Sequence, residues 1–128
     1  MRILLDTHVL IWALSEPHRI AKDARTIISD AHNEVLFSAA SIWEIAIKAQ
    51  IGRARFAFEP ERIADEAVAS GFEELPVRSA AAARVAQLPL HHRDPFDRIL
   101  IAQAMCEPAR FFTVDDNLVR YSEIVTRI

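Results

Sequence analysis

The sequence has few residues that form cross-links and few that interrupt regular structure. Its single cysteine, Cys106, excludes an intrachain disulfide and a cysteine-rich zinc site. Cys106 lies in an apolar stretch with helical character, so we expect its thiol to be buried and unreactive. Only 2 of the 128 residues are glycine and 52% are hydrophobic, which indicates a globular, helix-rich chain rather than a disordered one.

Long hydrophobic runs and an excess of positive charge are also missing. No apolar run reaches the roughly 18 residues of a membrane span. Asp6 interrupts the pattern of a secretory signal, so we expect a cytoplasmic protein with no membrane partner. The formal net charge is −3, unlike that of a protein that binds nucleic acid through bulk charge. If nucleic acid is the substrate, local basic residues or bound cations must offset the carboxylates.

What is present is an alternation of strand and helix patterns, with no repeat and no linker, which predicts a single domain over 1–128. Short apolar runs predict strands over 3–5 and 35–37, and further strands are expected over 72–76, 110–113 and 122–126. Helical spacing of apolar residues predicts helices over 7–14, 21–31, 41–50, 60–70, 79–89 and 95–105. This order implies an α/β fold with a mainly parallel sheet covered by helices on both faces.

Four carboxylates occupy similar positions along this predicted order. Asp6 and Asp115 each follow a strand, whereas Glu44 and Asp97 each lie in the first turn of a helix. If the strands are parallel, all four acids lie at the same edge of the sheet, where open α/β sheets bind ligands. They would repel one another unless cations bind between them, and oxygen ligands select hard cations such as Mg²⁺ or Mn²⁺. Such a site suits phosphodiester hydrolysis.

Each carboxylate also has a simpler explanation as part of a helix start. Residues 41–44 have the pattern of a capping box, in which Glu44 would only return a hydrogen bond to the helix start. Asp94 can be an N-cap, and Asp97 can complement the helix dipole. Asp115 can cap the helix that follows it. The two explanations are compatible, because a helix start is a favourable place to hold an anion.

Four short motifs, taken together and in order, resemble those of the PIN-domain family, and more narrowly the VapC-type toxins of bacterial toxin–antitoxin pairs. The motifs are LLDTHVLIW (4–12), SAASIWEIAIK (38–48), HRDPFDRILIAQA (92–104) and TVD (113–115). The resemblance covers the whole chain. It implies a three-layer α/β/α sandwich and a Mg²⁺- or Mn²⁺-dependent endoribonuclease that cleaves RNA. It also implies a homodimer, or a higher toxin–antitoxin assembly, and a cognate antitoxin as partner.

The resemblance also assigns roles to individual residues. The family's four acidic positions fall on Asp6, Glu44, Asp97 and Asp115. Supporting polar positions fall on Thr7, Ser41 and Thr113. Asp94 is a frequent companion, which we assign to a capping or supporting role, and Asp116 is expected at an exposed helix start. As a hypothesis, the first three acids hold one metal, and Asp115 completes the site or helps to hold a second cation.

Basic residues near the motifs are candidates for phosphate contacts. They are Lys48, Arg53, Arg55, Arg93 and Arg98. Arg98 is the best candidate because it follows Asp97, although it could instead pair with a neighbouring acid; for most of the others an ordinary solvated charge is the favoured interpretation. We favour a structural or exposed role for His8, His91 and His92, because the carboxylates already supply a metal site.

Four large aromatic residues are candidates for the core or for a partner site. Trp12, Trp43, Phe56 and Phe58 are mostly expected in the core. Phe56 and Phe58 alternate with polar or small residues outside any clear helix, so they are candidates to line an exposed groove. The resemblance implies that an antitoxin helix would lie in such a groove, and that its tail could place a basic side chain among the carboxylates.

Two other classes of function remain open. A non-catalytic PIN-like RNA-binding or scaffold domain is the first alternative, and the complete set of four acids argues against it. An aspartate-based phosphotransferase is the second. The haloacid-dehalogenase type needs a second aspartate two residues after the first, where His8 stands, and the receiver type needs paired acids near the N-terminus, which are absent.

Overall fold

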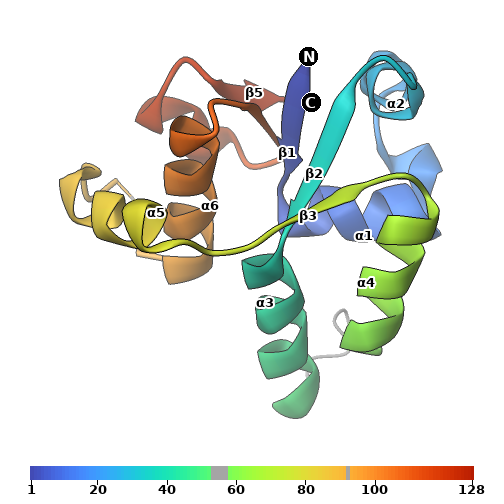
Figure 1. The fold of residues 1–128 in the computed structure, drawn as a ribbon, viewed down its shortest axis with the longest axis horizontal. Coiled ribbons are helices and arrows are strands. Elements are labelled where there is room, and N and C mark those ends of the chain that lie inside the picture. Colours follow the sequence, from blue (N-terminus) through green and yellow to red (C-terminus); the bar gives the residue numbers. More distant parts are fainter. Residues whose placement is uncertain (53–57, 92) are drawn as a thin grey trace.

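Five parallel strands form the centre of the molecule (Figure 1). The computed structural model describes residues 1–52, 58–91 and 93–128. The strands stand in the order β3-β2-β1-β4-β5, and every neighbouring pair is parallel. Their bounds are β1 Arg2–Leu5, β2 Glu34–Ser38, β3 Glu73–Leu75, β4 Arg110–Thr113 and β5 Val125–Arg127. The predicted strands and the parallel sheet are therefore confirmed.

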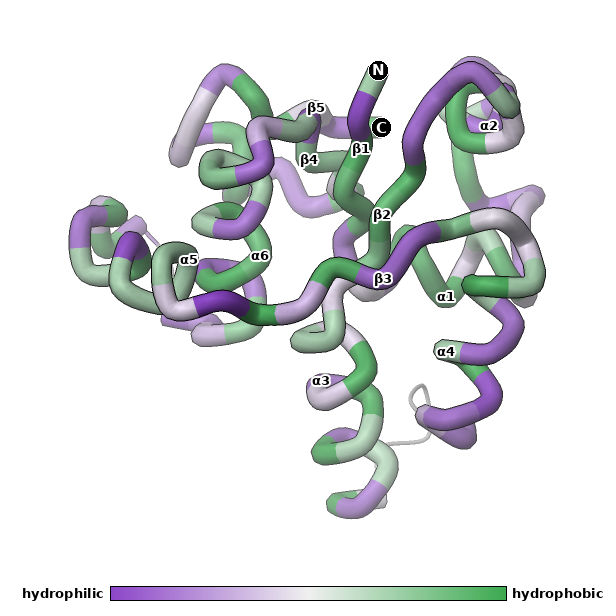
Figure 2. The backbone as a smooth tube through the Cα atoms, in the orientation of Figure 1, coloured by the Kyte–Doolittle hydropathy of each residue, from purple (hydrophilic) through white to green (hydrophobic). Residues whose placement is uncertain are grey.

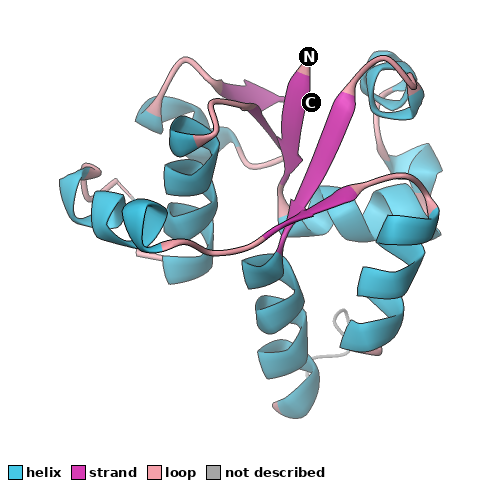
Figure 3. Cartoon of the chain, in the orientation of Figure 1, coloured by secondary structure: helices cyan, strands magenta, loops and turns pink. Residues whose placement is uncertain are grey.

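Helices cover both faces of this sheet, which confirms the three-layer α/β/α sandwich (Figures 1 and 3). One face carries α1, α2 and α4, the other carries α5 and α6, and α3 extends from the sheet edge at which β2 ends. The α-helices are α1 Thr7–Ser15, α2 Lys22–Ser29, α3 Ala39–Gln50, α4 Pro60–Ala69, α5 Ser79–Arg84 and α6 Pro95–Cys106. Short 3₁₀ helices are η1 Pro17–Arg19, η3 Val85–Gln87 and η4 Asp116–Tyr121.

The apolar strands divide their side chains between two cores, because successive residues of a strand point to opposite faces. In β1, Ile3 and Leu5 pack against the face that carries α1, α2 and α4, whereas Leu4 packs toward α6. Phe37 of β2 and Phe111 of β4, the strands on either side of β1, also belong to opposite cores. Figure 2 shows the resulting apolar colour of the central strand. Burial on both faces fixes the strand register, because a slip by one residue would exchange the two cores.

The start of α3 differs from the prediction. Strand β2 runs directly into the helix, and Ser38 is the N-cap, its Oγ accepting a hydrogen bond of 3.0 Å from the backbone N–H of Ala40. Helix α3 therefore begins at Ala39 rather than at Ser41, and the predicted capping box over 41–44 is wrong. Since Glu44 lies more than one turn inside the helix, capping does not explain this acid.

The far end of α6 also differs from the prediction. Cys106 is the last residue of α6 and is exposed, which corrects the expectation of a buried thiol. The physical reason is that the fully buried stretch of this helix ends at Ala104. No helix in the described ranges is long and apolar enough to cross a membrane.

Candidate active site

The acidic residues named from the sequence lie near the edge at which the parallel strands end. Asp6 and Asp115 follow β1 and β4, and Glu44 and Asp97 lie on α3 and α6. Leu5 of β1 is in register with Phe112 of β4, and the backbone N–H of Asp6 donates to Phe112 O at 2.9 Å. Asp6 therefore lies beside Thr113, the last residue of β4. Because β1 is the central strand, Asp6 is at the middle of this sheet edge. Strand pairing alone thus places Asp6 between β2, which leads to Glu44, and β4, which leads to Asp115.

The carboxylate of Asp6 is fixed by hydrogen bonds on both oxygens. Thr113 Oγ1 donates to Asp6 Oδ2 at 2.6 Å, and the backbone N–H of Thr7 donates to Oδ1 at 2.7 Å. The same Thr113 hydroxyl accepts a hydrogen bond of 3.1 Å from the backbone N–H of Asp115. One buried threonine therefore links the first acid to the fourth.

Glu44 is buried and is also held at both oxygens. Thr7 Oγ1 donates to Glu44 Oε1 at 2.7 Å and is hydrogen-bonded to Ser41 Oγ at 2.9 Å. Lys48 Nζ lies 2.5 Å from Glu44 Oε2, one helical turn further along α3. The two hydroxyl residues suggested as supporting positions thus connect the start of α1 to the acid of α3.

Asp97 lies in the first turn of α6, at the third acidic position. The N-cap of that helix is Asp94, whose Oδ1 accepts hydrogen bonds from the backbone N–H groups of Phe96 (2.8 Å) and Asp97 (3.2 Å). This confirms the capping role of Asp94. Asp115 is likewise the N-cap of η4, where its Oδ1 accepts from the Asn117 N–H at 2.9 Å. Capping and membership of the acidic cluster therefore coexist in Asp115.

The electrostatics show that these acids influence one another. Burial, followed by the charges of Asp6, Asp94, Glu44 and Asp115, raises the pKa of Asp97 from 3.8 to about 8. Burial also raises the pKa of Asp6 to about 6, against the opposing effect of its hydrogen bonds from Thr113 and Thr7. Negative charge is therefore costly here, and a bound cation would lower that cost.

The side chains nevertheless stand apart in the described structure. Among residues 1–52, 58–91 and 93–128, no group of three or more acidic, histidine or cysteine side chains is arranged to hold a metal ion. The four acids therefore share an edge and an electrostatic environment without forming a closed coordination shell.

Arg98 does not occupy the position expected of a phosphate-binding residue. Its guanidinium is buried and donates to Pro89 O (2.8 Å), Val85 O (3.1 Å) and the Tyr121 hydroxyl (3.3 Å). The prediction of a substrate contact is therefore wrong. Arg98 projects from α6 into the segment that follows α5, where it donates to Pro89 O and gives a second donor to Val85 O, which also accepts from the Leu88 N–H.

Gln103 is a buried polar residue that the sequence reasoning missed. Ser38 Oγ donates to Gln103 Oε1 at 2.6 Å, and Gln103 Nε2 donates to Pro76 O at 3.3 Å. Gln103 thus ties α6 to the ends of β2 and β3. The available signal was an amide side chain in an otherwise apolar helix stretch, where a polar group needs a buried partner.

The remaining candidates lie at the surface or outside the described ranges. Arg93, His91 and Asp116 are exposed, and His91 makes an edge contact with Tyr121 at 5.1 Å between ring centroids. His8 is half-buried and makes an edge contact with Trp12. The predictions for Arg53, Arg55, Phe56 and His92 concern residues that the structure does not describe.

The aromatic residues divide between the core and the surface. Trp12 and Phe58 are half-buried and pack against the core, and the Arg19 guanidinium covers the Trp12 ring at 4.3 Å. Trp43 is 61% exposed, which corrects its assignment to the core. Its ring makes an edge contact with Phe96 at 5.1 Å, so a pair of aromatic rings joins α3 to the start of α6.

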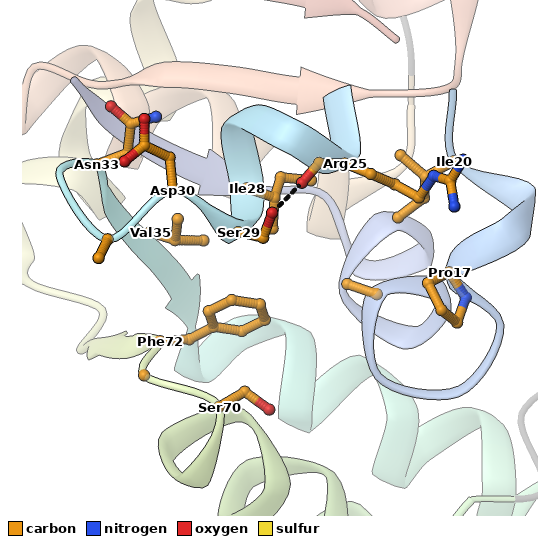
Figure 4. A pocket seen from close by; sticks show the side chains of 13 residues that line it. Pro17, Ile20, Arg25, Ile28, Ser29, Asp30, Asn33, Val35, Ser70 and Phe72 are labelled. Atoms are coloured by element: carbon orange, nitrogen blue, oxygen red, sulfur yellow. Dashed lines mark hydrogen bonds between the residues drawn. The ribbon is translucent and has the colours of Figure 1, made fainter. Parts of the chain in front are cut away.

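A cavity lies away from the acids, at the amino ends of β2 and β3 (Figure 4). Its volume is about 630 Å³, and it opens between α2 and the turn before β3. Apolar side chains line most of it, with polar groups among them: Ile20, Ile28, Val35, Phe72, Arg25 and Asp30. The molecule thus has an acidic sheet edge and, at the opposite edge, an apolar cavity.

Comparisons with solved structures find similar folds at low sequence identity. VapBC2 of Rickettsia felis, bound to a DNA fragment from its promoter, is 12% identical, with a TM-score of 0.72 and coverage of 98% of this chain and 96% of that one. Mycobacterium tuberculosis VapC20, a sarcin-ricin loop cleaving toxin, is 14% identical, with a TM-score of 0.61 and coverage of 98% and 99%. FitAcB of Neisseria gonorrhoeae is 19% identical, with a TM-score of 0.58 and coverage of 91% and 89%.

At these identities the solved structures establish the shared fold. No curated protein matches the sequence. The model of the PIN domain matches residues 3–124, which include all four acids. The chain therefore belongs to the PIN domain family.

Proposed function

We propose that this protein is a metal-dependent endoribonuclease and the toxin of a toxin–antitoxin pair. The observation that carries the proposal is the shared environment of its acids, in which burial and then the charges of neighbours that include Asp6, Glu44 and Asp115 raise the pKa of Asp97 to about 8. A cluster that resists its own ionisation is suited to a cation and to a substrate whose reaction a cation assists. Membership of the PIN family and the likeness in fold to toxin structures support the same assignment.

Asp6, Glu44 and Asp97 would hold a Mg²⁺ or Mn²⁺ ion, and Asp115 would complete the site or help to hold a second ion. The donor chemistry fits, because every candidate ligand is a carboxylate and these hard ions prefer oxygen. No three of these side chains are arranged to hold an ion together, and we propose that they hold it directly or through water. When bound, the ion would polarise a phosphoryl oxygen and lower the pKa of a nearby water.

The residues around the acids would orient them for this role. Thr113 fixes Asp6 Oδ2, and Thr7 fixes both Asp6 Oδ1, through its backbone, and Glu44 Oε1, through its hydroxyl. Such outer partners restrict the rotamers of ligating carboxylates and raise the precision of a site. Asp97 would carry a proton at neutral pH without a cation and release it when a cation binds.

We also propose an antitoxin as the protein partner and a homodimer as the minimal assembly. The cavity of Figure 4 has a mostly apolar lining with polar groups among it, which suits an amphipathic segment of an antitoxin. Exposed large apolar side chains support self-association; those of the described surface include Trp43, Ile51 and Leu90. Sedimentation of the purified protein would test the dimer, and loss of cleavage on adding saturating antitoxin would test the partner.

Cleavage of a mixed RNA pool tests the enzymatic proposal. The protein is purified under denaturing conditions to remove any bound antitoxin, refolded, and assayed with Mg²⁺, with Mn²⁺ and with chelator. Cleavage should need the metal and should disappear in Asp97→Asn. Asp65→Asn, the same chemical change on an exposed part of α4, should cleave like the parent. Cleavage that survives in Asp97→Asn would refute the assignment, and RNA binding without cleavage would favour the non-catalytic alternative.

A further inference from the structure

Lys48 is a cation inside the acidic cluster that the proposed chemistry does not yet use. It lies on α3, its side chain is 16% exposed, and its Nζ stands 2.5 Å from Glu44 Oε2. The other oxygen of Glu44 accepts the Thr7 hydroxyl at 2.7 Å. Glu44 is thus fixed on one side by Thr7 at the start of α1, and on the other it fixes the lysine ammonium.

The burial of this pair distinguishes it from a surface ion pair. Arg62 and Glu66 on α4 have the same four-residue spacing and a distance of 2.9 Å, but the Arg62 side chain is 73% exposed. An exposed pair of that kind contributes little to stability and has no need of a function. Removing a lysine from water is costly unless its charge is used, so a half-buried ammonium held on a buried carboxylate calls for a further explanation.

We propose that Lys48 binds a backbone phosphate of the RNA strand at the acidic edge, with Glu44 as its positioning residue. This inference rests on the proposed nuclease function. The acids of the cluster would repel a polyanionic strand, and a fixed cation beside them would offset that repulsion. An ammonium carries three N–H donors, so contacts with Glu44 and with a phosphate oxygen are compatible.

The other basic candidates with described positions fit this role less well. Arg98 donates its guanidinium hydrogens to backbone carbonyls and to Tyr121 inside the protein. Arg93 is exposed and makes no hydrogen bond to the four acids that the structure records. Lys48, by contrast, contacts one of these acids directly. A single fixed phosphate contact also agrees with the net charge of −3, which excludes binding through bulk positive charge.

The salt dependence of RNA binding tests the proposal separately from catalysis. Binding of a fluorescein-labelled single-stranded RNA of mixed sequence is followed by anisotropy at several salt concentrations, in an Asp97→Asn background that leaves the RNA intact. Each phosphate contact on a single strand contributes about 0.7 to the slope of log K against log salt. Lys48→Met should lower this slope by about 0.7 and weaken binding about three- to tenfold at low salt.

Two further variants make the result specific. Lys48→Arg keeps the charge and should keep the slope, and Arg62→Met removes an equally spaced partner of a glutamate on α4 and should leave the slope unchanged. Circular dichroism checks that each variant folds. If Lys48→Met leaves Glu44 without its partner and does not fold, the double variant Glu44→Gln/Lys48→Met removes both charges and takes its place.

The outcomes separate this inference from the function on which it rests. An unchanged slope in a folded Lys48→Met protein would overturn the phosphate role even if the parent cleaves RNA. A reduced slope in a protein whose parent cleaves no RNA would keep the phosphate role and overturn the nuclease. Failure of the Asp97→Asn protein to bind RNA at any salt concentration would overturn the phosphate role.

Discussion

Replacing Asp97 by asparagine should make the metal-free protein more stable at neutral pH, although it should abolish cleavage. The pKa of Asp97 is raised from 3.8 to about 8, so the folded protein at pH 7 must keep a proton that the unfolded chain releases. Asparagine has no such proton to retain. A residue expected to be essential for the reaction would thus be a source of instability in the resting protein.

The pH dependence follows from the direction of this shift. Below pH 3.8 the carboxyl is protonated in both the folded and the unfolded state, so the raised pKa costs no stability. As the pH rises from 3.8 toward about 8, the folded protein becomes progressively less stable relative to the unfolded chain. The parent and Asp97→Asn should therefore differ least near pH 4, and the advantage of the variant should grow toward neutral pH.

The magnitude follows from the same two values. Each pH unit above 3.8 costs about 1.4 kcal/mol until the folded pKa is reached, which gives an upper limit of about 4 kcal/mol at pH 7. Partial solvent exposure of Asp97 reduces this figure, and we expect a gain of about 1–4 kcal/mol. For a chain of 128 residues, 1 kcal/mol corresponds to a rise in Tm of about 3–6 °C.

Urea unfolding in the presence of chelator, at pH values from 4 to 8, measures the effect. Asp65→Asn, on the exposed surface of α4, serves as the control and should change the free energy of unfolding by less than about 0.5 kcal/mol. Adding Mn²⁺ should stabilise the parent more than the variant, because a ligand stabilises the state that binds it. An Asp97→Asn protein no more stable than the parent at pH 7 in chelator would refute the electrostatic reasoning.

Three further changes probe the surroundings of the acids. Thr113→Val keeps the side-chain shape but removes the hydroxyl that donates to Asp6, so metal-dependent cleavage should fall about 10- to 100-fold; parental kinetics would contradict this role. Arg98→Met removes the guanidinium donor from Pro89 O and Val85 O and should lower the urea-derived free energy of unfolding by about 1–3 kcal/mol, whereas a purely substrate-binding arginine would leave it unchanged. Cys106 is exposed, so a thiol reagent should modify it in the native protein as fast as in urea; strong protection would contradict its position at the end of α6.

Local sequence patterns predicted the helices and strands because burial of a strand and capping of a helix each depend on a few neighbouring residues. Three successive apolar residues, 3–5, are typical of a strand buried on both faces of a sheet, and they form the central strand. Asp94 followed by proline predicted the start of α6 because an N-cap side chain and a proline with a preset φ both favour a first turn. The order of acids along these elements then placed the candidate site at one edge.

Local patterns were a weaker guide where a residue's surroundings depend on how distant parts of the chain are arranged. Residues 41–44 match a capping box, yet the helix begins at Ala39, because β2 ends at Ser38 and no loop intervenes. Trp43 is apolar in an apolar helix, yet it is exposed, since α3 extends beyond the sheet edge rather than lying on a face.

The sequence alone thus determined which residue types are available for chemistry, whereas the tertiary structure decided what each of them touches. Arg98 and Lys48 looked alike as basic residues near acids, but one donates to backbone carbonyls and the other to Glu44. Thr113 and Asp6 are 107 positions apart and are joined by a 2.6 Å hydrogen bond. Such pairings depend on the order and register of the strands, which nonlocal burial fixes and no short stretch of sequence contains.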